Sequence, residues 1–330
     1  MTPLVIATTL VVTVLATGFA TGPLIRRAAP ALMRTPRLTV GILGGVLLVW
    51  LVGLAAFGPT LAWALGAPTG LLPGASGEVC QRCLAAANPL PAELSLGAGI
   101  PAVILLALPV VLAVMMFVAG LRYRRQQHQH KQQLTSALQV SARKMQLAGH
   151  FVTIIPHDQP TAFAMADRRW GIVVSTALIR LLNAEEVTAV IAHEAAHVRQ
   201  RHHLVTGILH GVFTPLRWVP LVNAVSTAIP QYLEMAADNA ARQATSTEVM
   251  ASALLKIGEG GGPVEARSAG GGVALHAAGI DRIRHLIAPP DASRSVAPIA
   301  TMSLTTMLVS ISTALVLLPY WQAILDGCLA

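Results

Sequence analysis

Long apolar runs occupy both ends of the chain, and more polar residues fill the region between them. Four of these runs contain no Asp, Glu, Lys or Arg: residues 3–20, 38–57, 96–121 and 297–321. About 20 apolar residues in a helix cross the hydrocarbon core, where a charged side chain is costly. The pattern therefore predicts four transmembrane helices. A fifth run, residues 204–213, is too short to span and predicts a buried core helix or a membrane-surface segment.

The composition agrees with a membrane protein. Of the 330 residues, 54% are hydrophobic and only 12% are charged, whereas soluble domains carry about 25% charged residues. The spans divide the chain into residues 1–121, with three helices and an external loop at 58–95, a polar region at 122–296, and residues 297–330, with the fourth helix and a short external tail.

Lysine and arginine placement predicts the orientation of these segments. The loop 21–37 holds four arginines, the loop 58–95 holds only Arg82, and the third span is followed by several basic residues. Basic loops remain on the cytoplasmic side. We therefore expect both termini outside the cell membrane and residues 122–296 in the cytoplasm.

The net charge of +8 fits basic loops that face anionic membrane lipid. No nucleic-acid-binding pattern accompanies the charge, so direct nucleic acid binding is not expected. All three cysteines, Cys80, Cys83 and Cys328, fall on the predicted outer side, where disulfides persist. The pairing remains open between a bridge within CQRC and one from CQRC to Cys328.

Residues 122–175 predict the start of an α+β domain. The polar stretch 122–148 is typical of a helix that leaves the membrane. Short β-prone runs follow over 149–175, interrupted by Pro156, Pro160 and Gly171. They predict a small sheet of two or three strands, and an exposed edge of such a sheet can bind a peptide as an added strand. The predicted fold class is thus mainly α, with four transmembrane helices and a cytoplasmic α+β domain.

A helix with an unusual buried face comes next. Asn183 and Glu186 form a capping-box pattern, and the helix is predicted to continue to about His202. Its apolar stripe, by i, i+3, i+4 spacing, comprises Val187, Val190, Ile191 and Val198.

His193, Glu194 and His197 lie on or beside that stripe. A buried, unpaired carboxylate is strongly disfavoured, and a divalent metal would explain the cluster. Histidines at i and i+4 lie about 40° apart around a helix, so both rings can reach one ion. Glu194 would then take a proton from the attacking water as a general base. The alternative is a chance match in an alanine-rich helix.

A catalytic zinc site needs a third protein ligand and one open position. The segment 231–243, which follows Pro230, offers Glu234 as the ligand and Asp238, one turn later, to orient a ligating histidine. Small alanines around them predict close approach to the first helix. A solvated acidic face is the alternative for this pair. The other ligand candidates are His202, His203 and His210, of which His202 and His203 are predicted to be surface residues.

HEAAH, followed by EMAAD, resembles the gluzincin arrangement of integral-membrane zinc metallopeptidases over roughly residues 150–245. The resemblance implies a zincin-like metalloprotease domain with one Zn²⁺ per chain and a protein or peptide substrate. Two branches of such enzymes compete: the antirepressor, or beta-lactam sensor-transducer, type and the heat-shock and CAAX-prenyl endopeptidase type.

The predicted order of three spans, a protease domain and a fourth span favours the antirepressor type. That resemblance implies regulatory signalling, by cleavage of a transcriptional repressor or of the protein itself. The heat-shock type implies quality control of membrane proteins. A third hypothesis is a non-catalytic, metal-stabilised signalling scaffold, which would have no use for Glu194.

One further segment, ALHAAGIDRIRHL at 274–286, is similar to a part of the heat-shock branch in which a histidine precedes an Arg-Ile pair. The resemblance implies that His276 stabilises the oxyanion of the tetrahedral intermediate. The proline that usually follows this histidine is Ala277 here. The alternative is an ordinary histidine at the start of a helix.

Overall fold

The computed structural model describes residues 3–65, 102–141, 143–165, 170–260, 282, 286 and 296–329. The helices are α1 (Pro3–Leu32), α2 (Pro36–Leu65), α4 (Ala102–Ser141), α5 (Thr176–Leu181), α6 (Ala184–Arg199), α7 (His202–Gly211), α8 (Pro220–Ala244), α9 (Thr247–Gly260) and α11 (Val296–Leu329), with a 3₁₀ turn at Thr214–Leu216. The strands are β1 (Arg143–Leu147), β2 (His150–Ile155), β3 (Ala162–Ala164) and β4 (Ile172–Ser175). The predicted combination of many helices with a small sheet is confirmed.

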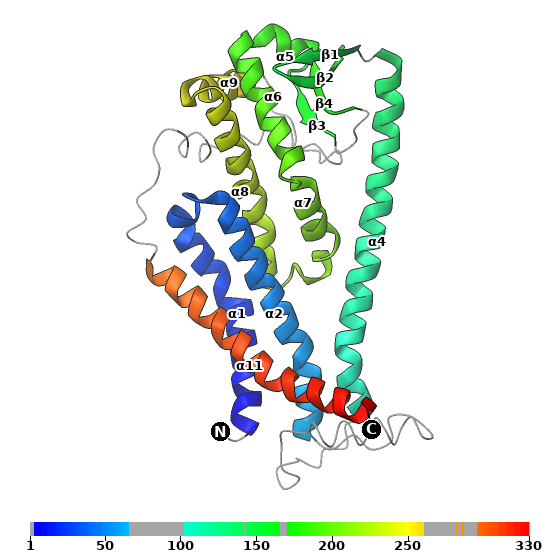
Figure 1. The fold of residues 1–330 in the computed structure, drawn as a ribbon, viewed down its shortest axis with the longest axis vertical. Helices are drawn as coiled ribbons and strands as arrows, with labels where there is room; N and C mark the ends of the chain where they lie inside the picture. Colours follow the sequence, from blue (N-terminus) through cyan, green and yellow to red (C-terminus); the bar gives the residue numbers. More distant parts are fainter. Residues whose placement is uncertain are drawn as a thin grey trace.

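Three helices among the described residues are long and apolar enough to cross a membrane: Thr8–Leu32, Pro36–Gly58 and Val296–Leu315. They lie within α1, α2 and α11, which contact one another at one end of the molecule (Figure 1). The third predicted span, 96–121, lies partly outside the described residues. Within it, α4 begins at Ala102, and its side chains are described from Pro109 onward.

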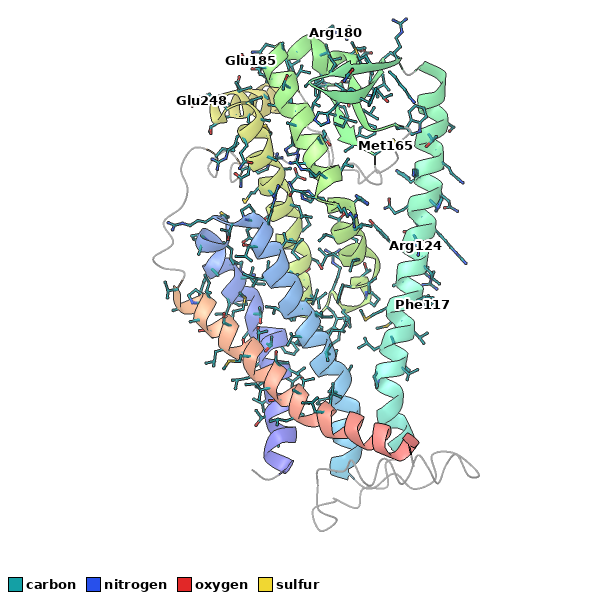
Figure 2. All side chains as sticks on the ribbon, viewed as in Figure 1. Phe117, Arg124, Met165, Arg180, Glu185 and Glu248 are labelled. Carbon is teal, nitrogen blue, oxygen red and sulfur yellow. The ribbon has the colours of Figure 1, made fainter. Side chains whose placement is uncertain are left out.

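Helix α4 connects the membrane end to the sheet. Figure 2 shows Phe117 on its apolar part and, two turns closer to the sheet, Arg124 on its basic part. The helix was expected to cover residues 122–148, but it ends at Ser141, and the last residues of that stretch form strand β1. Residues Arg143–Leu147 pair with β2 instead, through a two-residue turn in which Ala148 and Gly149 both have positive φ. Such turns favour Asn-Gly or Asp-Gly, so Ala-Gly gave little warning of the hairpin.

The sheet has four strands in the order β1-β2-β4-β3, rather than two or three. β1 and β2 are antiparallel, β2 and β4 are parallel, and β3 pairs antiparallel with β4 through Phe163 and Val173. β3 therefore forms one edge of the sheet described here, and it contacts α6.

Two hydrophobic cores meet along α8. One core packs α1, α2 and α11 against the first half of α8, around Leu43, Leu221 and Val225. The other packs the sheet, α6 and α9 together, around Val190 and Leu254. Figure 1 shows α8 running from the membrane helices to α9, beside α6. α8 thereby joins the membrane end to the end that carries the sheet.

Candidate metal centre

Helix α6 is fixed at its start by the predicted capping box, which is confirmed. The Asn183 side chain accepts a hydrogen bond from the Glu186 N–H at 2.8 Å, and the Asn183 N–H donates to Glu186 Oε2 at 2.9 Å. Glu186 also accepts hydrogen bonds from Ser252 and Lys256 of α9. These contacts set the position of α6 along its axis, and with it the position of the histidines three turns later.

Small residues bring α6 and α8 together. Ala196 of α6 packs against Ala237 and Ala240 of α8, and all three are buried. This confirms the close approach expected from the alanines. Pro230 lies inside α8 rather than at the end of a preceding segment, so the prediction of a break there is wrong. Because α8 continues through it, Glu234 and Asp238 are held on one long helix.

The two α6 histidines and Glu234 converge. His193 Nε2 lies 3.1 Å from His197 Nε2, 3.5 Å separates His193 Nε2 from Glu234 Oε2, and 3.5 Å separates His197 Nε2 from Glu234 Oε1. Ligand atoms that bind one tetrahedral zinc at about 2.0–2.1 Å are about 3.3 Å apart. The three side chains form a triangle in which one ligand atom from each residue lies within 4.8 Å of the others, close enough to hold one metal ion, although the two Glu234 distances end on different carboxylate oxygens. The buried Glu234 Oε2 has no hydrogen-bond partner in the described chain.

The negative charge of the carboxylates in this cluster also favours a bound cation. Burial alone would lower the pKa of His193, but the carboxylates of Asp238 and Glu234 raise it to about 10. Burial lowers the pKa of His197 to about 4, so its ring is neutral and able to ligate. The carboxylates thus attract a positive charge to this point, and a divalent cation can supply it in place of the proton on His193.

Glu194 lies beside the triangle and is only 3% exposed. Burial raises the pKa of its carboxyl to about 7, although a hydrogen bond from the Ala164 N–H of β3 opposes this effect. Its Oε1 has no hydrogen-bond partner among the described residues. A carboxyl group that exchanges a proton near neutral pH suits a general base.

Asp238 lies next to the Nδ1 atom of His193, and Arg282 binds Asp238 in turn. Asp238 Oδ1 lies 3.0 Å from His193 Nδ1, which is hydrogen-bonding distance although the ring N–H is not aimed straight at the oxygen. Arg282 Nε donates to Asp238 Oδ2 at 2.8 Å, and Arg282 Nη1 lies 3.3 Å from Glu234 Oε2. Burial would raise the pKa of Asp238, but hydrogen bonds from His193 and Arg282 lower it to about 2.

Sequence reasoning missed Arg282 as a site residue. It is only 4% exposed and lies 44 positions after Asp238 in the chain, so no helical periodicity connects the two. Its place in the Arg-Ile pair near His276 was the only signal. His276 itself lies outside the described residues, as do Cys80 and Cys83.

Three other expectations about the end of α6 are wrong. The helix ends at Arg199 rather than at His202, and Val198 is 39% exposed instead of buried. His202, expected at the surface, is 4% exposed, and its Nδ1 lies 2.9 Å from His197 Nδ1. Burial, together with the neighbouring His197, lowers the pKa of His202 to about 3. His203 is exposed as predicted.

Comparison with known proteins shows that this cluster lies in a segment that matches a known protein family. Residues 124–258 match the model of Peptidase family M48. The matched segment runs from α4 to α9 and includes all five candidate site residues on α6 and α8: His193, Glu194, His197, Glu234 and Asp238.

Two curated relatives are similar over a shorter stretch. The Protease HtpX homolog of Thermodesulfovibrio yellowstonii is 41% identical over 69 residues, covering 20% of this chain and 24% of the relative. That of Thermoanaerobacter pseudethanolicus is 37% identical over 75 residues, covering 21% and 25%. The chain thus spans about a quarter of the length of the curated relatives it matches. No solved structure matches the chain. Together with the His193, His197 and Glu234 cluster, these matches indicate a zinc metallopeptidase domain within residues 124–258.

Proposed function

We propose that the protein is a membrane-embedded, zinc-dependent endopeptidase. The observation that supports this most strongly is the triangle of His193, His197 and Glu234, with the buried carboxylate of Glu194 beside it. A structural zinc site uses four protein ligands, whereas a catalytic site keeps one position open. Three protein ligands with an adjacent general base match the catalytic arrangement, and the metal-stabilised scaffold gives Glu194 no role.

The chain's own residues divide the work of hydrolysis. Bound zinc supplies a Lewis acid that polarises the scissile carbonyl and lowers the pKa of water. Glu194 accepts a proton from the attacking water and returns it to the leaving amine, for which its pKa of about 7 is suited. Asp238 holds the His193 ring through Nδ1, and Arg282 holds Asp238. We assign oxyanion stabilisation to His276 from the family resemblance.

The substrate peptide is proposed to bind along β3. This strand forms an edge of the described sheet, and the Ala164 N–H reaches the Glu194 carboxylate. A peptide that pairs with such an edge is held by main-chain hydrogen bonds. Its scissile bond would then lie close to the general base, whatever its side chains are.

We place the peptidase domain in the cytoplasm, with both termini outside and α4 as the remaining one of four spans. Two observations support this topology. Basic residues follow the apolar part of α4, and four arginines (Arg26, Arg27, Arg34 and Arg37) lie where α1 ends and α2 begins. In addition, α1 begins and α11 ends at the same end of the molecule, far from the sheet (Figure 1).

Two substrate classes follow from the two branches of the resemblance. The predicted order of spans supports a regulatory protease that cleaves a transcriptional repressor or its own domain. The curated relatives carry the name Protease HtpX homolog, which is closer to the heat-shock branch and supports membrane-protein quality control as the second candidate.

Metal analysis and proteolysis of the purified full chain test the proposal. We expect one zinc per chain in detergent and cleavage of unfolded casein that a chelator stops and zinc restores. The Glu194→Gln form should retain zinc and lose cleavage. An absence of stoichiometric zinc, or equal cleavage by the wild type and Glu194→Gln, would overturn the proposal.

Comparative proteomics of cells that carry the wild type or Glu194→Gln separates the two substrate classes. A regulatory protease should leave one or a few proteins uncut in the variant, with a transcriptional response. A quality-control protease should leave many damaged membrane proteins to accumulate. A control strain with Glu185→Gln, an exposed residue on the same helix, should resemble the wild type.

A further inference from the structure

A histidine outside the ligand set contacts one of the ligands. The Nδ1 atoms of His202 and His197 lie 2.9 Å apart, and the two rings meet edge to face with centroids 4.7 Å apart. His202 is 4% exposed. The role proposed for the site so far makes no use of this residue.

The backbone departs from helical geometry to make this contact. Residues i and i+5 of an unbroken α-helix lie about 140° apart around the axis, so His202 would point away from His197 if α6 continued. Instead, Arg201 adopts the left-handed conformation, with φ 54° and ψ 38°, between α6 and α7. A non-glycine residue rarely adopts this conformation, because its Cβ comes too close to the following carbonyl oxygen. Arg201 adopts it at the position where the chain turns His202 back toward His197.

The hydrogen bonds around His202 allow one consistent assignment of donors. The Nε2 of His197 faces His193 and Glu234, so a ligating His197 carries its proton on Nδ1. That N–H donates to His202 Nδ1, because a neutral imidazole has one donor and one acceptor nitrogen. The Nε2–H of His202 then donates to Gln200 Oε1 at 3.1 Å.

This series of hydrogen bonds reaches a membrane-spanning helix. The side chain of Arg37 donates from Nε to the same Gln200 Oε1 at 3.1 Å. Arg37 lies in the first turn of α2, at one end of the candidate span Pro36–Gly58. The two contacts at Gln200 therefore connect the start of α2 with the ring of His202.

We propose that His202 is a positioning residue that fixes the ring and tautomer of His197 for metal binding, and that Gln200 and Arg37 extend this support to α2. The inference rests on the proposed zinc site. Loss of a hydrogen-bond partner behind a ligating histidine typically weakens metal affinity about 10–100-fold. We expect His202→Ala to fall in that range, with smaller losses for Gln200→Ala and Arg37→Ala.

Cobalt is the probe of choice, because its visible absorption reports ligand geometry without any substrate. The full-length, metal-free protein is titrated with Co²⁺ alone in detergent as wild type, His202→Ala, His202→Asn and His203→Ala. The Asn Oδ1 is bonded to the same Cγ position as His Nδ1, so His202→Asn keeps an acceptor for His197. His203 is exposed and adjacent in the chain, which makes His203→Ala the matched control.

We expect His202→Ala to weaken Co²⁺ binding and change its absorption, His202→Asn to restore most of both, and His203→Ala to match the wild type. Equal affinities for His202→Ala and His203→Ala would overturn the inference, as would a lack of rescue by His202→Asn. If His202→Ala does not fold, the Co²⁺ affinity of Gln200→Ala is the test. An affinity equal to that of the wild type would overturn the proposed series of hydrogen bonds. A wild type that binds no Co²⁺ would instead overturn the zinc site itself.

Discussion

The first half of α8, before Pro230, contacts the membrane helices through apolar side chains, whereas the second half carries the acidic residues of the candidate metal centre. Leu221, Val222 and Val225 of the first half are fully buried in the core shared with α1, α2 and α11. In the second half, Glu234 and Asp238 are nearly as deeply buried, and their carboxylates face histidines and an arginine. One helix thus serves two different environments.

The difference shows what each environment requires. Burial of apolar volume tolerates many side chains of suitable size. A buried carboxylate instead requires particular partner atoms at hydrogen-bonding distance. Substitutions in the first half should therefore change the free energy of unfolding and leave the metal site intact. Substitutions around the second half should weaken metal binding or catalysis.

The strongest test of this separation is Glu194→Gln, on α6 beside the candidate metal centre. Loss of a general base should lower kcat/KM about 10²–10⁴-fold, with the melting temperature and zinc content unchanged. Glu185→Gln, exposed on the same helix, is the control. A large loss of stability in Glu194→Gln would show that this carboxylate is structural.

Leu221→Ala tests the apolar half. Leu221 is fully buried, and replacement of such a leucine by alanine lowers the free energy of unfolding by about 2–5 kcal/mol. Denaturant unfolding in detergent measures the loss, and Leu204→Ala, at a leucine that is 49% exposed, should lose much less. We expect the Co²⁺ affinity of folded Leu221→Ala to equal that of the wild type. A drop in affinity would mean that the two halves of α8 are coupled.

Asp238→Asn tests the acidic half. The amide keeps the shape of the carboxylate but loses the charge that faces His193 and Arg282. We expect zinc affinity to fall about 10–100-fold, measured by competition with a chromogenic chelator. Asp158→Asn, at an exposed aspartate, should bind zinc as the wild type does, and an unchanged affinity in Asp238→Asn would remove Asp238 from the site.

Glu186→Gln gives the smallest expected effect, because a glutamine can still accept the Asn183 N–H in a capping box and only the charge that faces the half-exposed Lys256 is lost, a change of about 1 kcal/mol or less. Burial would raise the pKa of Glu186, but hydrogen bonds from Lys256, the Asn183 N–H and Ser252 lower it below the ordinary 4.5. A lowered pKa in the folded state stabilises the protein above the pKa of the unfolded chain, and that contribution is lost as the pH falls through the folded value. The difference in melting temperature from the wild type should thus be present at neutral pH and shrink below pH 4.5. A difference independent of pH would contradict this assignment.

Local patterns were sufficient to predict part of the site. The capping box, the two histidines on one face of a helix and the i, i+4 pair of Glu234 and Asp238 all follow from helix periodicity. What periodicity could not supply was contact between separate elements. Arg282 approaches Asp238 from a distant part of the chain, and no local rule predicts such a pair.

The end of α6 was mispredicted for a related reason. Apolar spacing placed Val198 inside, whereas the neighbouring Arg199 and Arg201 placed His202 at the surface, at the end of a helix that was expected to continue to His202. The left-handed Arg201 breaks that assumption, and arginine gives no sign of a positive φ as glycine would. In the same way, Ala148 and Gly149 formed a hairpin where a longer polar helix was expected.

The length of α4 has a mechanical consequence. This single helix of 40 residues is about 60 Å long, and it leads almost directly into β1, at the opposite side of the sheet from β3. A tilt of about 5° at the bilayer would displace its distant end by about 5 Å, close to the spacing of about 4.8 Å between neighbouring strands. In the proposed topology, in which α4 spans the bilayer, a hydrophobic mismatch that changes the tilt of this helix would therefore move β1 by about the separation of two strands.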